Sequence, residues 1–234
     1  MSLTSNKQLT TILGVGLSVG LTALIAYRLS KNKKQGHSKK ESTNILGLEM
    51  GGTGCKISLI NRRWNKTTGK YDYQIVSRHE TESTSPTETV DRLLAFVQGS
   101  QFSQIGIASF GPVCLNKNDP AYGSITSTPK LQWQHFSLLK YIHEKTSCQD
   151  VSIDTDVNAA ALAEYRLGIE FYQWIANVLG NHNANSLIYV TVGTGVGVGV
   201  VVDGKPVHGL THPEGGHILY QTNFLFPNKI LALD

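Results

Sequence analysis

The sequence contains little cysteine, and its few cysteines form no framework. The 234 residues include only Cys55, Cys114 and Cys148, which are odd in number, widely separated and free of any Cys-x-x-Cys pair. Small secreted scaffolds held together by disulfides need an even, closely spaced set, so this pattern argues against that class. We therefore expect free thiols in a reducing compartment.

Charge is also scarce, and it is unevenly placed. Only 16% of the residues are charged while 40% are hydrophobic, which favours a buried core over general disorder. Residues 1–40 contain no Asp or Glu but hold seven of the 21 basic residues, which leaves 14 basic against 17 acidic residues in the body. Because the body is mildly acidic despite the net charge of +4, we expect no nucleic-acid partner.

A segment near the N-terminus has no charged side chain between Gln8 and Tyr27. Its roughly 20 residues match a hydrocarbon core about 30 Å thick. We predict a transmembrane anchor at 8–28 after a short tail at 1–7, with a secretory signal peptide as the alternative. Six basic residues follow within the stretch that ends at Lys40, so the positive-inside rule places the body in the cytosol. The membrane is then that of the endoplasmic reticulum or the mitochondrial outer membrane, and residues 29–43 form a basic linker.

The body alternates short apolar runs with glycine-rich turns. In chain order, the predicted elements are strands at 45–49, 56–60 and about 73–77, a helix at 87–97, a strand at 105–108, a helix from 156, and strands at 186–192 and 200–202. Thr87 is the expected N-cap of the first helix, and Asp203-Gly204 is a two-residue hairpin turn. The order favours an α/β, two-lobed architecture with one glycine turn in each half, at Gly51–Gly54 and at Gly193–Gly199.

Both glycine turns allow backbone N–H groups to approach an anion, although either turn taken alone is more often structural. Neither is a Walker A loop, because no Gly-x-x-x-x-Gly-Lys-Ser/Thr motif occurs. Asp156 is the best candidate for a general base, since N–H groups of the first helical turn would keep it ionised. A simple helix N-cap is the alternative for Asp156. The segment from His212 to His217 suits sugar hydroxyls or a metal, with a solvated loop as the alternative.

In this order, these segments resemble the ROK-family sugar kinases of the actin-like ATPase superfamily, and the fructokinase branch in particular. The resemblance runs from about Ile45 to His217. The segments that carry it are Gly106–Val113 (GIASFGPV), Ile125–Lys130 (ITSTPK), Asp154–Leu162 (DTDVNAAAL), Tyr189–Gly197 (YVTVGTGVG) and His212–His217 (HPEGGH).

The resemblance implies an α/β actin-like ATPase (ribonuclease H-like) fold. An N-terminal lobe would occupy 44–154, a partial C-terminal lobe 155–221 and a divergent tail 222–234. The implied activity is ATP- and Mg²⁺-dependent phosphorylation of a hexose, above all of fructose to fructose 6-phosphate. The partners would be the hexose, ATP and, through the N-terminal helix, a membrane, while a homodimer is left open.

The resemblance also implies residue roles. Asp156 would remove the proton of the sugar hydroxyl, with Asn158 in support, and Glu49 would help to place Mg²⁺ through the phosphates. The phosphate-binding residues would be Gly51, Gly52, Thr53, Gly193, Thr194 and Gly195. The sugar-binding residues would be Gly111, Pro112, Asn158, Glu214 and His217.

The sequence departs from the family pattern in several places. His217 matches the first zinc ligand of the family, but no Cys or His follows it in 218–234, so we predict that zinc is not bound. The segment that carries the family's adenine pocket should begin where this chain ends, so we expect poor ATP affinity. Leu131-Gln132 stands where the family usually has Pro-Gly, which puts the geometry of the sugar loop in doubt. Residues 171–185 resemble an inserted loop.

Three functions are compatible with these observations. The first is a fructokinase or related hexose kinase that uses Asp156 as its base. The second is a catalytically inactive, membrane-tethered sugar-binding module derived from a ROK kinase. The third is a ROK-type transcriptional regulator, which would need an N-terminal helix-turn-helix where the apolar segment 8–28 stands.

Overall fold

The computed structural model describes residues 42–167, 185–192, 196–208, 215, 220–221 and 230–231. The chain forms two compact units, Met1–Asp156 and Val157–Asp234. The predicted membrane segment 8–28 lies outside the described residues. Within the described ranges, no helix is long and apolar enough to span a bilayer.

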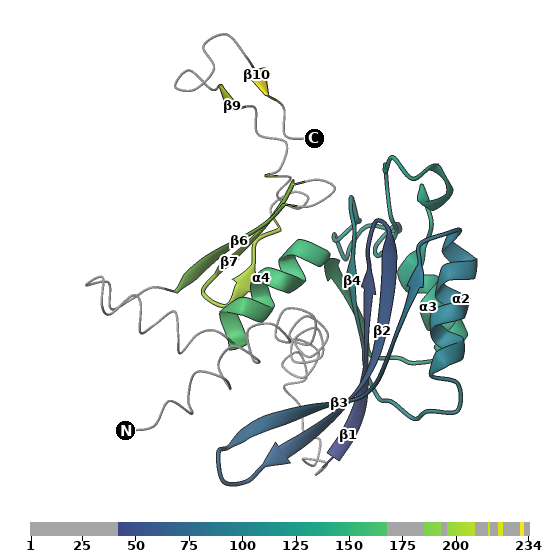
Figure 1. Ribbon diagram of the computed structural model, residues 1–234, viewed down its shortest axis with the longest axis vertical. Coiled ribbons are helices and arrows are strands. Elements are labelled where there is room, and N and C mark those ends of the chain that lie inside the picture. The colour runs from purple at the N-terminus through teal and green to yellow at the C-terminus, as the bar shows by residue number, and fades with distance from the viewer. Residues whose placement is uncertain are drawn as a thin grey trace, which may run out of the picture. The chain divides into compact units, whose positions relative to one another are not determined.

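The first unit contains a five-stranded sheet with the order β3-β2-β1-β4-β5 (Figure 1). Its strands are β1 (Ser42–Met50), β2 (Gly54–Asn65), β3 (Lys70–Glu82), β4 (Ile105–Ser109) and β5 (Val151–Thr155). The first three strands form an antiparallel meander, whereas β1, β4 and β5 are parallel to one another. The sheet therefore combines a hairpin edge with a parallel half.

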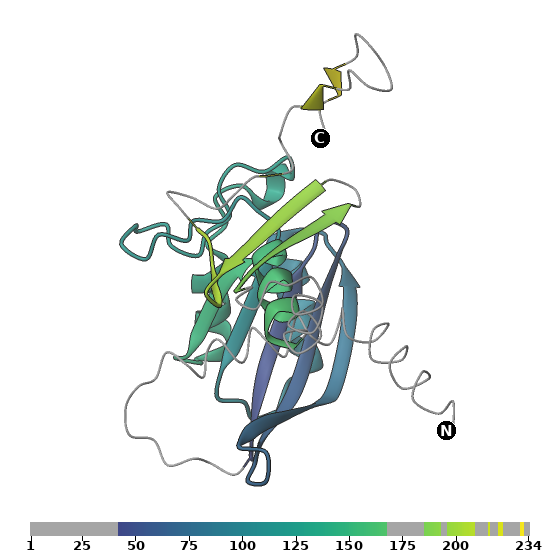
Figure 2. The ribbon, with the colours of Figure 1, turned by 90° about the vertical axis from the view of Figure 1, so that its left-hand side faces the viewer.

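The predicted meander is confirmed, and its strands are longer than expected. The turn between β2 and β3 forms because the side-chain oxygen of Asn65 accepts hydrogen bonds from the N–H groups of Thr67 and Thr68, at 3.0 and 3.1 Å. Gly69 closes this turn with a φ of 64°. The resulting hairpin extends beyond the neighbouring strands (Figure 1, Figure 2).

Helices α2 (Pro86–Phe96) and α3 (Leu138–Thr146) cover one face of this sheet (Figure 1). Both bury apolar side chains in the main core, which also contains alternate residues of β1 and the whole ring system of Trp133. The expectation that Thr87 caps the first helix was wrong. Ser85 occupies the N-cap position and Pro86 follows it inside the helix, where its missing N–H is not needed.

The second unit begins within α4 (Asp156–Leu167) and includes a three-stranded antiparallel sheet with the order β6-β7-β8. These strands are β6 (Ser186–Val192), β7 (Val196–Val202) and β8 (Lys205–Pro206), and a separate pair is β9 (Tyr220–Gln221) with β10 (Ile230–Leu231). The predicted turn at Asp203-Gly204 is confirmed, with positive φ at both residues. The second glycine turn is shorter than expected, because Gly197 and Gly199 lie within β7.

Gly199 lets strand β7 approach helix α4 closely. A Cβ atom at this position would collide with the carbonyl oxygen of Val157. Glycine at position 199 is therefore required for the packing of β7 against α4. This requirement explains why glycines occur within β7 as well as in the turn before it.

Replacement of Ile107 by Ala should strongly destabilise the first unit. Ile107 is fully buried in β4, so the loss of three carbons leaves a cavity and should lower the free energy of unfolding by about 2–5 kcal/mol. The control is Val76→Ala, because the Val76 side chain on β3 is 56% exposed and its loss should cost less than about 1 kcal/mol. Urea unfolding followed by tryptophan fluorescence measures both values, and equal losses would contradict the assigned core.

Candidate active site

The parallel strands bring three loops to one edge of the first sheet. Met50 of β1 lies opposite Ser109 of β4, which in turn lies opposite Thr155 of β5. All three residues are the last of their strands, so the segments that follow them begin side by side. Ligands of open α/β sheets bind at the carboxyl ends of the strands, which makes this edge the candidate active site.

The segment after β1 is the first predicted phosphate turn. It is closed by a hydrogen bond from the N–H of Gly51 to the carbonyl oxygen of Gly54, at 3.1 Å. Gly52 and Thr53 are exposed, and a Cβ atom at Gly52 would meet no atom within 4 Å. Within the described residues, the N–H groups of Gly52 and Thr53 donate no hydrogen bond. The turn thus has two exposed residues whose N–H groups have no partner among the described residues, as an anion site requires.

A buried thiol supports this turn from below. Cys55 has no exposed surface, and its Sγ lies 3.7 Å from the carbonyl oxygen of Gly51. Burial raises the pKa of the Cys55 thiol above its ordinary value. This effect outweighs the hydrogen bonding with Gly51 and Ser83 and the positive charge of Lys130, which lower the pKa. Cys55 is therefore a neutral packing residue, in agreement with the prediction of a free thiol.

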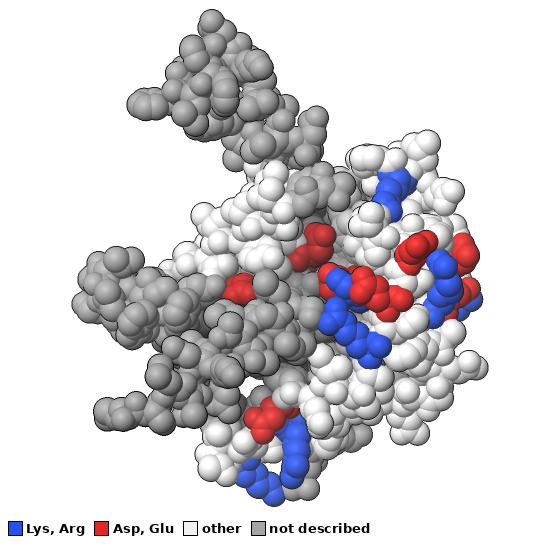
Figure 3. Space-filling model, viewed as in Figure 1, with Lys and Arg blue, Asp and Glu red and all other residues white. Residues whose placement is uncertain are grey.

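Glu49, the predicted Mg²⁺-placing residue, is the next-to-last residue of β1. Its carboxylate lies 3.5 Å from the ammonium group of Lys56, which is also 3.9 Å from a carboxylate oxygen of Glu80. Acidic and basic side chains likewise lie next to one another on the face drawn in Figure 3. No group of three or more metal-ligating side chains occurs within the described part of the chain. A single carboxylate at a phosphate turn still fits Mg²⁺, which takes one or two carboxylates together with substrate phosphates.

The segment after β4 contains Gly111 and Pro112, the predicted wall of the sugar pocket. The N–H of Phe110 donates to the carbonyl oxygen of Met50 at 2.8 Å, which joins this loop to the end of β1. The carbonyl oxygen of Pro112 accepts hydrogen bonds from both the N–H and the hydroxyl of Thr126, at 2.8 and 3.2 Å. The loop is therefore held by backbone contacts at this edge of the sheet.

Asp156 directly follows β5 and is the first residue of α4. Its side chain is partly exposed, whereas the neighbouring Asp154 is buried and accepts a hydrogen bond from the N–H of Thr155 at 2.9 Å. The structure thus places Asp156, a partly exposed carboxylate, at the start of the helix that the sequence predicted from residue 156. Asn158, the expected support of the base, is fully buried in the second unit.

The remaining predicted site residues lie outside the described ranges. They are Gly193, Thr194 and Gly195 of the second turn, the sugar-binding Glu214, and His217, which was also assigned to the zinc position. Their roles, and the prediction that zinc is absent, stay predictions.

Lys130 and Ser83, for which the sequence predicted no role, also lie at this edge. The Ser83 N–H donates to the carbonyl oxygen of Thr53 at 3.0 Å, and Lys130 Nζ donates to Ser83 Oγ at 3.0 Å. Beside them, Trp133 Nε1 donates to the carbonyl oxygen of Thr84 at 2.8 Å, with its indole against Phe110. Leu131-Gln132, which departs from the family pattern, begins a short 3-10 helix, Leu131–Trp133. This helix contains the buried Trp133.

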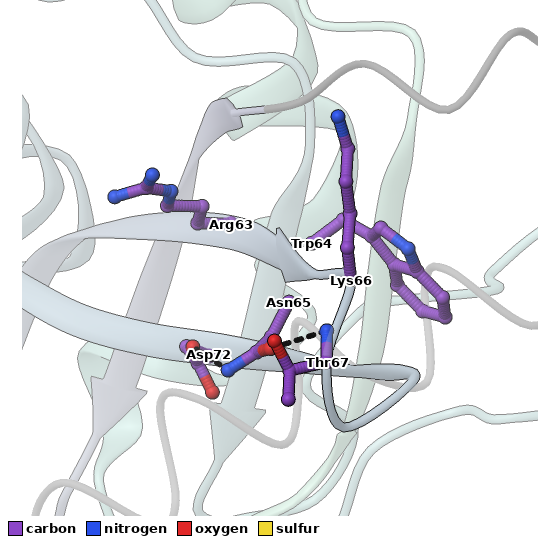
Figure 4. Close-up of a pocket in the computed structure, with 6 residues that line it drawn as sticks. All are labelled: Arg63, Trp64, Asn65, Lys66, Thr67 and Asp72. Atoms are coloured by element: carbon purple, nitrogen blue, oxygen red, sulfur yellow. Dashed lines mark hydrogen bonds between the residues drawn. The ribbon is translucent and has the colours of Figure 1, made fainter.

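A separate hollow of about 400 Å³ lies at the opposite end of the sheet (Figure 4). Its walls are the tip of the β2–β3 hairpin, where Asn65 Nδ2 donates to Asp72 Oδ2 at 2.9 Å. Arg63 also lines it, but its side chain and that of Lys66 do not point toward a common centre (Figure 4). Because Arg63 pairs with Ser42 at the start of β1, this hollow lies far along the strands from the glycine turn.

Comparison with known proteins identifies the family. The ROK family model matches residues 45–228. The chain belongs to the ROK family. A fructokinase from Zymomonas mobilis subsp. mobilis is 39% identical over 185 residues, which are 76% of this chain and 54% of that protein. A putative fructokinase from Bacillus subtilis is 36% identical over 172 residues, with 74% and 50% covered. The chain thus spans about half the length of these relatives.

Solved structures show the fold of this ROK chain. One of them is a ROK family glucokinase from Streptomyces griseus in complex with glucose and AMPPNP. It matches with a TM-score of 0.55 at 23% sequence identity, and the match covers 78% of this chain and 52% of the glucokinase chain. A putative N-acetylmannosamine kinase from Listeria monocytogenes has a TM-score of 0.50 at 22% identity, with 71% and 50% covered. The predicted α/β actin-like ATPase fold is confirmed.

The two glycines of the phosphate turn should respond differently to substitution. Gly51→Ala should lower the free energy of unfolding by about 1–3 kcal/mol, because the new Cβ would collide with the carbonyl oxygen of Gly54. Gly52→Ala should change it by less than about 0.5 kcal/mol, since this Cβ enters open space. Chemical denaturation measures both variants, and a larger loss for Gly52→Ala would show that the turn has a different geometry.

Proposed function

We propose that this chain phosphorylates a hexose, with fructose as the preferred substrate and fructose 6-phosphate as the product. The observation that carries the proposal is the shared edge, at which Asp156 and the Gly51–Gly54 turn both follow parallel, in-register strands. A base for a sugar hydroxyl and a cradle for phosphates are the two parts that phosphoryl transfer to an alcohol needs. The fructokinase relatives support this choice of sugar.

In the proposed reaction, a sugar hydroxyl oxygen attacks the γ-phosphorus of ATP. The new bond joins that oxygen to phosphorus, the bond from phosphorus to the β,γ-bridging oxygen breaks, and ADP leaves with the bonding electrons. The hydroxyl proton passes to a carboxylate oxygen of Asp156, whose place at the start of α4 keeps it ionised beforehand. The N–H groups of Gly52 and Thr53 hold phosphate oxygens and orient the terminal phosphoryl group.

Glu49 would help to hold Mg²⁺, which would neutralise charge on the phosphate oxygens when bound. The Gly111-Pro112 loop would form one wall of the sugar pocket and would exclude water. Gly193, Thr194 and Gly195 are proposed as a second phosphate contact, and Glu214 and His217 as sugar contacts. These five assignments depend on the family resemblance.

Replacement of Asp156 by Asn should abolish phosphoryl transfer. The full chain, supplied with fructose, ATP and Mg²⁺, should form fructose 6-phosphate and ADP, and Asp156→Asn should lower kcat by about 10²–10⁴-fold through loss of the base. The matched control is Asp72→Asn at the far end of the sheet, which should keep kcat within about twofold. Phosphorus NMR measures the rate of product formation by the wild type, by Asp156→Asn and by Asp72→Asn.

Equal turnover in the wild type and Asp156→Asn would overturn the assignment of the base. The alternative function, a sugar-binding module without catalysis, predicts a different outcome: fructose binds in calorimetry, but no ADP forms with any hexose. The motifs are shared among kinases for several hexoses and do not determine the sugar. Parallel assays with glucose, mannose and N-acetylmannosamine therefore identify the preferred substrate.

We also propose that residues 8–28 anchor the chain in a membrane as a single span, with the ROK domain in the cytosol. The proposal rests on the uncharged segment and on the basic residues that follow it. The full chain should stay in the membrane fraction after carbonate extraction, and protease added to intact organelles should digest the ROK domain. Release by carbonate would contradict the span, and protection from protease would contradict the orientation.

A further inference from the structure

The ammonium group of Lys130 lies between two loops of the candidate site. Its Nζ is 3.0 Å from Ser83 Oγ and 5.6 Å from the centre of the Phe110 ring. Ser83 is bonded through its N–H to the carbonyl oxygen of Thr53 in the phosphate turn, and Phe110 immediately precedes Gly111. Lys130 therefore reaches both the phosphate turn and the proposed sugar loop from a segment that the mechanism above does not use.

The positive charge of Lys130 is half-buried and is not neutralised within the described residues. Its ammonium group lies beside a hydroxyl and an aromatic ring, and no carboxylate oxygen of the described residues lies within 4 Å of its Nζ. The carboxylates of Glu49 on β1 and Glu80 on β3 both lie within 4 Å of Lys56 Nζ instead. Because this ammonium group has no carboxylate partner among the described residues, it is available to an incoming anion.

The charge of Lys130 lies close enough to Cys55 to influence its thiol. Among the electrostatic effects on Cys55, which touches Gly51, the positive charge of Lys130 is one that lowers the pKa of the thiol, although burial dominates and raises it. Gly52 and Thr53 of the same turn are exposed, and within the described residues their N–H groups donate no hydrogen bond. Exposed N–H groups and an unpaired ammonium group beside one turn form a complementary site for an anion with several oxygens.

We propose that Lys130 binds the terminal phosphoryl group of the nucleoside triphosphate held by the Gly51–Gly54 turn. The inference rests on the proposed function and adds a cation to a turn that otherwise offers only uncharged donors. Lys130 would donate hydrogen bonds to non-bridging phosphate oxygens and would stabilise the charge that they carry during transfer. In the absence of the anion, the ammonium group donates to Ser83 Oγ instead.

A purely structural role for Lys130, as a tether of the Ser83 segment, makes a different prediction. If the tether alone mattered, removal of the Ser83 hydroxyl would have the same effect as removal of the ammonium group. If the charge matters, the Ser83→Ala variant retains it and loses little. The two roles can therefore be separated by one pair of variants.

The test measures binding of inorganic tripolyphosphate with Mg²⁺ to the full chain by calorimetry, because this probe reports on phosphate contacts without an adenine or a sugar. Lys130→Met should weaken binding by about 10- to 100-fold, as expected for loss of a charged hydrogen bond. Ser83→Ala should weaken it by less than about threefold. Lys140→Met is the matched control, because Lys140 lies on α3 with a 75% exposed side chain beside Glu144, and it should bind like the wild type.

Fructose affinity, measured in the same way, should change by less than about twofold in Lys130→Met, and the thermal unfolding curves of all variants should coincide. Equal tripolyphosphate binding by the wild type and Lys130→Met would overturn the inference. So would equal losses in Ser83→Ala and Lys130→Met, or a wild type that does not bind tripolyphosphate. A Lys130-dependent affinity without sugar phosphorylation would support the inference and contradict the proposed function, whereas turnover that is unaffected in Lys130→Met would contradict the inference alone.

Discussion

The parallel pairing of β1, β4 and β5 is the constraint on which the candidate site depends. It aligns Met50, Ser109 and Thr155, so the phosphate turn, the Gly111-Pro112 loop and Asp156 all begin at one edge of the sheet. A shift of one residue between any two strands would reverse the faces on which their side chains lie and would expose the buried Ile107. The core that stabilises the sheet therefore also determines the geometry of the site.

Much of the fold could be predicted where local patterns are strong. The bounds of β6 and the hairpin turn at Asp203-Gly204 follow from an apolar run and from turn chemistry. Strand β5 and helix α3 were not predicted. Strand β5 contains Ser152 and the buried Asp154, so it lacks the apolar pattern of a central strand and depends on its pairing with β4. The same tertiary effect places Gly199 inside a strand, against α4.

Some residues of the candidate site could be predicted from the sequence, whereas others could be found only from the fold. Glu49, the first glycine turn and Asp156 could be found because each stands directly after or within a recognisable strand or helix, and the order of the motifs indicated the ROK family. The position of Lys130 could not be found, because its contact with Ser83 joins residues that are 47 apart in the sequence. The sequence shows that a lysine follows Thr128-Pro129, whereas only the fold shows that its charge reaches the turn.

The central claim is that a sugar hydroxyl and a terminal phosphate meet at the carboxyl end of the parallel strands. A crystal structure of the full chain with fructose, Mg²⁺ and AMPPNP tests this claim most directly. We expect a fructose hydroxyl within about 3 Å of a carboxylate oxygen of Asp156 and a phosphate oxygen at the N–H groups of Gly52 and Thr53. Fructose bound at another surface, or an Asp156 carboxylate directed away from the sugar, would contradict it.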